Sequence, residues 1–297
     1  MTHDKHGLSF IIPAYNEHAN IAGTLRRTQQ VLASLDIPTE IVLVDDGSTD
    51  GTPEAAQQVA GVKVISHPVN IGYGNALKTG IRAAHHGWVG IVDADGTYPI
   101  EDIPKLVDEM RKGFDMVIGL RTNVSEMDLP VKRGFRWVFK TIVKLFVGKN
   151  IHDPNSGLRV FKRELAVGLF PFLCGTFSFT TSLTILATGM SCFIKYVPVT
   201  YSPRGGKSKV RHIRDSLRTL QYIVQGITFF NPIKFFLILS VLMILFVCIP
   251  AMVLAVFWMH TLSLYYMIFG TTVVLLIGLG VLGDIVRISA NQKDARE

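Results

Sequence analysis

The stretch 88-WVGIVDAD-95 decides the fold. An apolar run ends there in two acidic residues that one alanine separates. Two earlier stretches, 8-LSFIIPAYNE-17 and 40-EIVLVDD-46, are built in the same way, with a short apolar run followed by polar residues. Segments with helical periodicity separate these runs. Strands that alternate with helices at this spacing predict an α/β domain with a doubly wound, mostly parallel sheet.

The first half of the chain carries most of the predicted elements. The predicted strands are residues 8–12, 40–44, 62–65, 88–92 and 115–118, and the predicted helices are 17–35, 52–60, 75–84 and 103–112. In sheets of this kind, ligands bind beyond the carboxyl ends of the strands. The polar residues that follow three of the strands are therefore candidate site residues, namely Tyr15, Asn16, Glu17, Asp45, Asp46, Asp93 and Asp95.

Two long apolar segments near the C-terminal end indicate a membrane protein. The 297-residue chain is 48% hydrophobic and 18% charged, with a mean hydropathy of +0.34. Its apolar residues concentrate in 233–257 and 262–283, and each segment can cross a hydrocarbon core of ~30 Å, for which roughly 20 residues suffice. This composition argues against a purely soluble protein, a disordered chain or a small disulfide scaffold. We expect residues 232–297 to form a two-helix transmembrane hairpin with a short cytoplasmic tail.

The charge pattern predicts the orientation in the membrane. There are 30 Lys and Arg residues against 23 Asp and Glu, a net charge of +7. Cations are dense before the first apolar segment and recur after the second, whereas the link 259–261 has none, so both termini are expected in the cytoplasm of a multi-pass cell-membrane protein. Residues 1–7 lack the features of a signal peptide, which places the main domain, 1–210, in the cytoplasm as well. With two apolar segments present, the basic balance favours membrane lipids over nucleic acid as a partner.

Two basic segments are candidates for the membrane surface. The first, 131-VKRGFRWVFKTIVKLFV-147, carries cations at helical spacing, interleaved with aromatic residues. A basic amphipathic helix of this kind is typical of a membrane-surface element, and an ordinary surface helix packed on the sheet is the alternative. Residues 211–231 are predicted to form a second, juxtamembrane amphipathic helix that leads into the first apolar segment.

The acidic turn after the fourth predicted strand offers a metal site. Asp93 and Asp95 present hard oxygen ligands that suit Mg²⁺ or Mn²⁺ held together with substrate phosphates, and two solvated turn acids are the alternative. Asp46 stands at a strand end, where a carboxylate can accept hydrogen bonds from a ribose or a base. We interpret Asp50 as a helix cap. The glycine-rich stretch 70–74 is interpreted mainly as a backbone turn, because it lacks a Walker lysine and the full GxGxxG pattern.

Taken in order, these strand-end motifs resemble those of family 2 glycosyltransferases of the GT-A fold. The segments 153-DPNSGLR-159 and 204-RGGKSK-209 are similar to the D-x-x-S-G-x-R and R-x-x-G-x-S-K motifs of the polyprenyl-phosphate branch, the second being one residue shorter here. The resemblance covers about residues 8–210, and a C-terminal hairpin is also typical of that branch. It implies a GT-A catalytic domain, with a Rossmann-like sheet, that acts as a dolichyl- or undecaprenyl-phosphate sugar synthase.

The resemblance also implies roles for individual residues. Those expected to bind the nucleotide-sugar donor are Pro13, Tyr15, Glu17, Val44, Asp46, Asp93, Ala94 and Asp95. Asp93 and Asp95 are the expected metal ligands, and Thr97 stands where the family commonly supplies a glutamine as a further ligand, which leaves the third protein ligand open. The residues expected to take part in catalysis are Asp95, Arg121, Arg204 and Lys209, and those expected at the lipid phosphate or headgroup are Arg133, Arg136, Arg159, Arg204 and Lys209.

The function implied is transfer of one sugar from a nucleotide-diphosphate sugar, with UDP favoured over GDP, to a polyprenyl phosphate, with inversion at the sugar carbon. Mg²⁺ or Mn²⁺ is the expected cofactor. A processive polysaccharide synthase is one alternative, because 133-RGFRW-137 is similar to a motif of such enzymes, although two apolar segments are few for a polymer channel. A membrane-tethered sugar-nucleotide binding protein without turnover is another. The apolar hairpin leaves homo-oligomerisation open.

Overall fold

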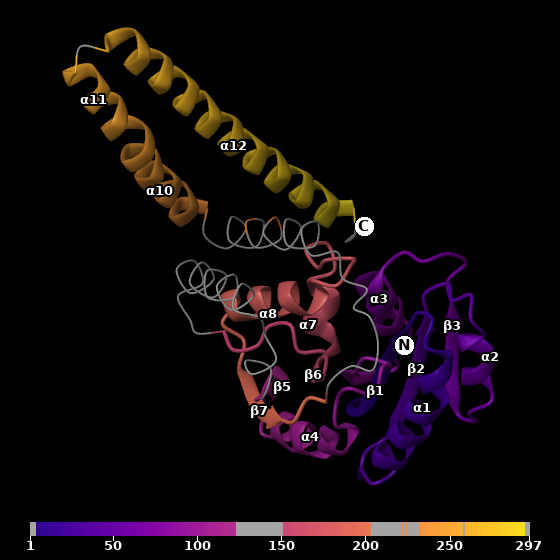
Figure 1. Cartoon of the computed structure of the whole chain (residues 1–297). Coiled ribbons are helices and arrows are strands. Elements are labelled where there is room, and N and C mark those ends of the chain that lie inside the picture. The colour runs from indigo at the N-terminus through magenta and orange to yellow at the C-terminus, as the bar shows by residue number, and fades with distance from the viewer. Residues whose placement is uncertain are drawn as a thin grey trace. The chain divides into compact units, whose positions relative to one another are not determined.

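The chain folds into two compact units in a computed structural model, which describes residues 4–122, 151–202, 221, 224, 232–257 and 259–294 (Figure 1). The first unit is Met1–Tyr222 and the second is Ile223–Glu297. The division between them falls within the predicted juxtamembrane segment 211–231. The first unit holds the sheet and its helices, and the second holds the two apolar helices.

The first unit is built on a seven-stranded sheet with the order β3-β2-β1-β4-β6-β5-β7. The strands are β1 (Asp4–Ala14), β2 (Thr39–Asp45), β3 (Val62–Ser66), β4 (His86–Ile91), β5 (Met116–Arg121), β6 (Arg159–Lys162) and β7 (Ile194–Val199). All neighbouring strands are parallel except β6, which runs antiparallel to both β4 and β5. The predicted α/β fold with a mostly parallel sheet is confirmed.

Helices cover both faces of this sheet. They are α1 (His18–Leu32), α2 (Thr52–Gln57), α3 (Tyr73–Ala83), the 3₁₀ turn η1 (Ile100–Asp102), α4 (Ile103–Arg111), α7 (Arg163–Gly168) and α8 (Phe179–Gly189). Helices α1, α2 and α4 pack on one side, and α3, α7 and α8 pack on the other (Figure 1). Successive side chains of a strand point to opposite faces, so a strand between two helical layers must be apolar throughout. In β1, Phe10 and Ile12 join the cluster with α1 and α4, whereas Ile11 lies against Gly80 of α3.

The chain order creates one crevice at the carboxyl edge of the sheet. From β1 the chain moves outward to β2 and then β3, and α3 carries it back to β4 on the other side of β1. Ligands of such sheets bind where the direction of winding reverses, beyond the ends of the two central strands. Here β1 ends at Ala14 and β4 at Ile91, so Tyr15 and the Asp93–Asp95 turn emerge side by side.

The second unit is a helical hairpin. Its elements are α10 (Pro232–Met243), the π-helical turn η2 (Ile244–Cys248), α11 (Ile249–Val256) and α12 (His260–Asp294). By length and composition, Phe236–Val256 and His260–Gly283 could each cross a membrane. These ranges overlap the predicted segments 233–257 and 262–283.

A proline explains why the first hairpin helix is irregular. Pro250 has no N–H to donate to the carbonyl of Phe246 four residues earlier, and the π-helical turn lies directly before it. The Tyr266 hydroxyl of α12 donates to this same carbonyl at 3.0 Å, and the Ser263 hydroxyl donates to the carbonyl of Ala251 at 2.6 Å. In a membrane, hydrogen bonds between two helices would stabilise such a pair, because lipid offers the polar groups no other partner.

We predict that Tyr266→Phe destabilises the hairpin. The substitution removes the hydroxyl that the Phe246 carbonyl accepts from, and a hydrogen bond of this kind contributes about 0.6–2 kcal/mol. The measurement is reversible unfolding in mixed detergent micelles, followed by circular dichroism. Tyr265→Phe is the matched control, because Tyr265 is 68% exposed and has no hydrogen bond among the described residues. Equal stability of the two variants would contradict the prediction.

Candidate active site

The loops that follow β1 and β2 are joined into one surface. The Asn16 N–H donates to the Ser48 hydroxyl at 2.9 Å, and the Asn16 side-chain oxygen accepts from the Thr49 N–H at 2.9 Å. Asn16 has a φ of +51°, which asparagine tolerates better than most residues. Tyr15 and Glu17, on either side of it, are half-buried and border the crevice.

Side-chain caps complete this surface at the start of two helices. Asp50 accepts from the N–H groups of His18 and Thr52 at 3.1 Å each, so it holds the first residues of both α1 and α2. The interpretation of Asp50 as a cap is confirmed. Val44, in contrast, is fully buried under α3, beside Gly80. Val44 thus packs beneath the crevice, and its expected contact with the donor stays a prediction. Pro13 is also buried.

Asp46 organises the glycine-rich turn. Its carboxylate accepts from the N–H groups of Ile71 at 3.1 Å and Gly72 at 2.8 Å, and it contacts His67 Nδ1 at 2.8 Å. Asp46 is only 3% exposed. Its expected contact with a base or ribose stays a prediction. Gly72 has a φ of +104°, a conformation that glycine adopts without strain, which agrees with the interpretation of this stretch as a backbone turn.

The acidic turn after β4 is held on three sides. The Tyr73 hydroxyl donates to Asp93 Oδ1 at 2.8 Å, and the Thr24 hydroxyl donates to the Ala94 carbonyl at 3.1 Å. Asp95 Oδ1 accepts from the N–H of Thr97 at 3.1 Å and from its hydroxyl at 2.7 Å. Thr97 is buried, and its hydroxyl donates to the Asp95 carboxylate. In this structure Thr97 therefore orients the expected metal ligand Asp95.

The residues of this turn fit a divalent metal that a substrate helps to bind. Among the described residues, no group of three or more His, Cys, Asp or Glu side chains could hold a metal ion. Asp93 and Asp95 alone supply two carboxylates. Mg²⁺ commonly takes one or two carboxylates from a protein and completes its octahedron with substrate phosphates and water. The donor set therefore suits a metal bound together with a diphosphate.

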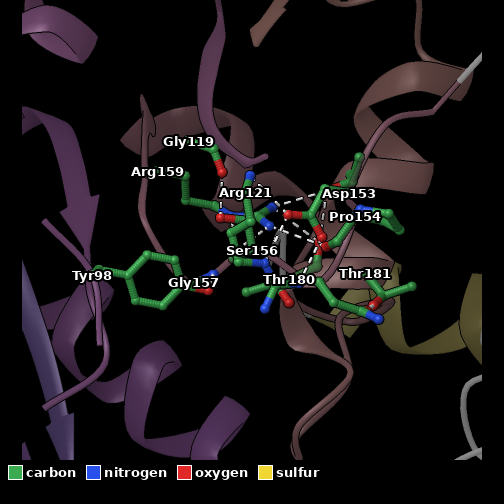
Figure 2. Close-up of polar contacts among 12 residues, drawn as sticks. Tyr98, Gly119, Arg121, Asp153, Pro154, Ser156, Gly157, Arg159, Thr180 and Thr181 are labelled. Atoms are coloured by element: carbon green, nitrogen blue, oxygen red, sulfur yellow. Dashed lines mark hydrogen bonds and ion pairs between the residues drawn. The ribbon is translucent and has the colours of Figure 1, made fainter. Parts of the chain in front are cut away.

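A bidentate ion pair lies beside the acidic turn. Arg121, at the end of β5, donates from Nε to Asp153 Oδ2 at 2.8 Å and from Nη2 to Oδ1 at 2.6 Å (Figure 2). The guanidinium also lies over the Tyr201 ring, 5.2 Å from its centre. Burial favours a lower pKa for Arg121, but the hydrogen bonds and charge of Asp153 raise it above its ordinary value. Arg121 is thus a permanent cation, and it enters any donor contact already paired with Asp153.

Arg159 is fully buried in the centre of this region (Figure 2). Its guanidinium donates to the carbonyls of Pro154 at 3.1 Å, Ser156 at 2.5 Å and Thr180 at 3.0 Å, and to the Thr184 hydroxyl at 2.9 Å. Burial lowers its pKa to about 10, which still leaves it charged at neutral pH. The expectation that Arg159 meets a lipid headgroup is therefore wrong, because it has no exposed surface. It fastens the 153–158 loop to α8.

The 153–158 loop returns to the acidic turn at its other end. The Gly157 N–H donates to the Tyr98 hydroxyl at 2.6 Å, and a Cβ on Gly157 would lie 2.6 Å from Asp93 Oδ2. Tyr98 packs edge-on against Tyr201, with ring centres 5.0 Å apart. The Ser202 N–H donates to the Thr97 carbonyl at 2.9 Å. Ser202, which precedes the predicted phosphate-binding residues Arg204 and Lys209, is thus anchored at Thr97, two residues after Asp95.

Several predicted site residues lie outside the described residues. They are Arg133, Arg136, Arg204 and Lys209, together with the segment 131–147 and, apart from Gln221 and Val224, the segment 211–230. Their roles stay predictions. The structure adds Tyr73, Tyr98 and Thr24 to the site, none of which the motifs marked. Tyr73 could have been noticed, because it is the one aromatic residue of the glycine-rich turn 70–74 and stands between its two glycines.

Comparisons with known proteins agree with this geometry. Residues 9–170 match the family model of Glycosyl transferase family 2. The undecaprenyl-phosphate 4-deoxy-4-formamido-L-arabinose transferase of Pseudomonas paraeruginosa is 33% identical over 213 residues, which cover 70% of this chain and 61% of that protein. The dolichyl-phosphate hexose transferase of Haloferax volcanii is 30% identical over 204 residues, 68% of this chain and 86% of that protein. The chain thus spans about three fifths of the length of the first relative and most of the second.

Solved structures show the same fold. The glucosyl-3-phosphoglycerate synthase of Mycobacterium tuberculosis, in complex with Mn²⁺, UDP-glucose and phosphoglyceric acid, superposes with a TM-score of 0.57 at 20% identity, over 76% of this chain and 79% of that one. The mannosyl-3-phosphoglycerate synthase of Rubrobacter xylanophilus gives a TM-score of 0.58 at 19% identity, over 75% and 73%. These likenesses concern the fold, which is GT-A. The family match over more than half of the chain, with a relative that is 30% identical over 68% of it, establishes that the chain belongs to glycosyltransferase family 2.

Proposed function

We propose that this protein transfers one sugar from a nucleotide-diphosphate sugar to a polyprenyl phosphate at a membrane, with inversion at the sugar carbon. The observation that carries the proposal is the Asp93–Asp95 pair at the switch point of a family 2 domain whose chain also has two membrane-length apolar helices. The names of the relatives support a lipid acceptor, since one acts with undecaprenyl phosphate and another with dolichyl phosphate. UDP is the favoured nucleotide of the donor.

The donor would lie along the carboxyl edge of the sheet. Tyr15 and Glu17 border the crevice where a base and ribose would fit, and Asp93 and Asp95 face the place of the diphosphate. These two carboxylates would hold Mg²⁺ or Mn²⁺. A bound metal ion would neutralise negative charge on the diphosphate. A fold neighbour with Mn²⁺ and UDP-glucose supports this arrangement.

The reaction needs little acid–base help from the protein. A phosphate monoester is anionic at neutral pH, so its oxygen can attack the anomeric carbon without a strong general base. The bond from that carbon to the new phosphate oxygen forms as its bond to the diphosphate breaks, and the diphosphate leaves with the electron pair. Attack opposite to the leaving group inverts the anomeric carbon. The task of the protein is to orient the two phosphates and to stabilise their charge.

Cations from several segments would share that task. Arg121 is a permanent cation beside the acidic turn, and Arg204 and Lys209 follow Ser202, which is anchored to the Thr97 carbonyl. We assign Arg204 and Lys209 to phosphates of the donor or the lipid. Arg133 and Arg136 would gather the acceptor headgroup, because each cation near an anionic surface contributes on the order of 1 kcal/mol.

The first prediction from the proposed function concerns the acceptor. Full-length protein in detergent, given UDP- and GDP-sugars in turn, is expected to release nucleoside diphosphate with a polyprenyl phosphate and to add one sugar. 3-Phosphoglycerate is the control acceptor, because it is a phosphate monoester without a lipid tail. A fold neighbour is named for its glucosylated form and was solved with phosphoglyceric acid bound. Release that is absent with every donor, or equal with the soluble acceptor, would contradict the proposal. A polymeric product would favour the processive alternative.

The second prediction concerns the metal. Asp95→Asn removes a charged ligand and is expected to lower the turnover rate by about 100-fold or more, since metal stabilisation of a leaving diphosphate contributes several kcal/mol. Chelation of divalent cations should abolish turnover of the wild-type protein, and Mn²⁺ or Mg²⁺ should restore it. Asp108→Asn is the matched control, because Asp108 is an exposed residue of α4. Full activity of Asp95→Asn, or turnover that survives chelation, would exclude the metal role.

A further inference from the structure

We propose that Tyr73 is a positioning residue that fixes the Asp93 carboxylate for metal binding. The inference rests on the proposed function, since it concerns the metal site of that reaction. It assigns a task to the glycine-rich turn 70–74, which lacks the features of a phosphate cradle and presents one phenol to the acidic turn.

The backbone around Tyr73 has little freedom. Asp46 holds the N–H groups of Ile71 and Gly72, and Gly72 adopts its φ of +104° directly before the tyrosine. On the other side, a Cβ on Gly74 would lie 2.1 Å from the carbonyl oxygen of Cys174, so the two segments are packed backbone to backbone. The start of α3 is therefore fixed on both sides of Tyr73.

The side chain is directed as well. The Tyr73 ring stacks on the Phe177 ring, with centres 6.0 Å apart and planes at 14°. With the ring held, the hydroxyl reaches Asp93 Oδ1 at 2.8 Å. A phenol is protonated at neutral pH and a carboxylate only accepts, so the Tyr73 hydroxyl is the donor of this bond.

Asp93 is confined from the opposite side by Gly157. A Cβ at that position would lie 2.6 Å from Asp93 Oδ2, so the backbone of the 153–158 loop limits rotation of the carboxylate. The Tyr73 hydroxyl and the Gly157 backbone therefore restrict the carboxylate from two sides. A neutral hydroxyl orients a ligand without cancelling its negative charge, which is what an outer partner of a metal ligand must do.

The test is metal binding to full-length protein in detergent, measured by the electron paramagnetic resonance signal of free Mn²⁺ in the presence of UDP. Removing an outer partner of a metal ligand typically costs about 10–100-fold in metal affinity, and Tyr73→Phe is expected to raise the Kd for Mn²⁺ by that factor. Excess Mn²⁺ should restore turnover of the variant, which a structural defect would not allow. Tyr196→Phe is the matched control, because Tyr196 is a half-buried tyrosine of β7 whose ring packs edge-on against His152.

A second variant keeps the test decisive if Tyr73→Phe folds poorly. Phe177→Ala keeps the hydroxyl but removes the ring on which Tyr73 stacks, and we expect a smaller rise in Kd. Wild-type Mn²⁺ affinity in folded Tyr73→Phe, or in Phe177→Ala if the first variant does not fold, overturns the inference, even where thermal stability falls. If wild-type protein with UDP binds no Mn²⁺, the proposed metal site fails instead.

Discussion

The buried guanidinium of Arg159 is the interaction on which the geometry of the site depends. A cation without a solvent-exposed surface must have its donors satisfied, and here carbonyl oxygens and a threonine hydroxyl satisfy them. The carbonyls of Pro154 and Ser156 would lose this donor if the guanidinium were absent, at about 1–3 kcal/mol for each buried group left unsatisfied. The Arg159 guanidinium therefore fixes the position of the 153–158 loop relative to α8.

That loop matters because its two ends meet the two sides of the site. Asp153, at one end, pairs with Arg121, and Gly157, at the other, closes against Asp93 and donates to Tyr98. Glycine is required at the second end because the carboxylate occupies the place of a Cβ. The position of the loop thus sets both the direction of the Arg121 guanidinium and the orientation of Asp93, the expected metal ligand. Neither task needs Arg159 to touch a substrate.

Hydrogen bonds that involve side chains extend this order along the edge of the sheet. Asn16 joins the first two loops, Asp46 joins the second loop to the glycine-rich turn, and Tyr73 joins that turn to Asp93. Each bond links residues at least 20 positions apart in sequence. The crevice is therefore lined by loops that hydrogen bonds join to one another and that a rigid sheet supports. These bonds preorganise the site, although each loop alone is not a rigid element.

The sequence predicts those parts of the fold that have a strong local pattern. β1, β2 and β4 are found because a strand buried on both faces is a continuous apolar run. β6 was not predicted, because it has four residues and pairs antiparallel between strands distant in sequence. Helix α8 was not predicted either, since it is buried all round and shows no amphipathic period. Arg159 was misassigned for a related reason, because a motif gives the residue and not its burial.

The second unit accounts for how this chain differs from fold neighbours with a soluble acceptor. The GT-A domain provides the donor site, and the transfer step asks of the acceptor only an anionic phosphate oxygen, so the domain alone places few chemical limits on the acceptor. Two membrane-length helices on the same chain change which phosphates are available, because a protein held at a membrane meets lipid headgroups at a high effective concentration. On this argument the donor is selected by the loops at the edge of the sheet. Under the proposed function, the acceptor would be selected by the hairpin and by the basic segments that precede it in sequence.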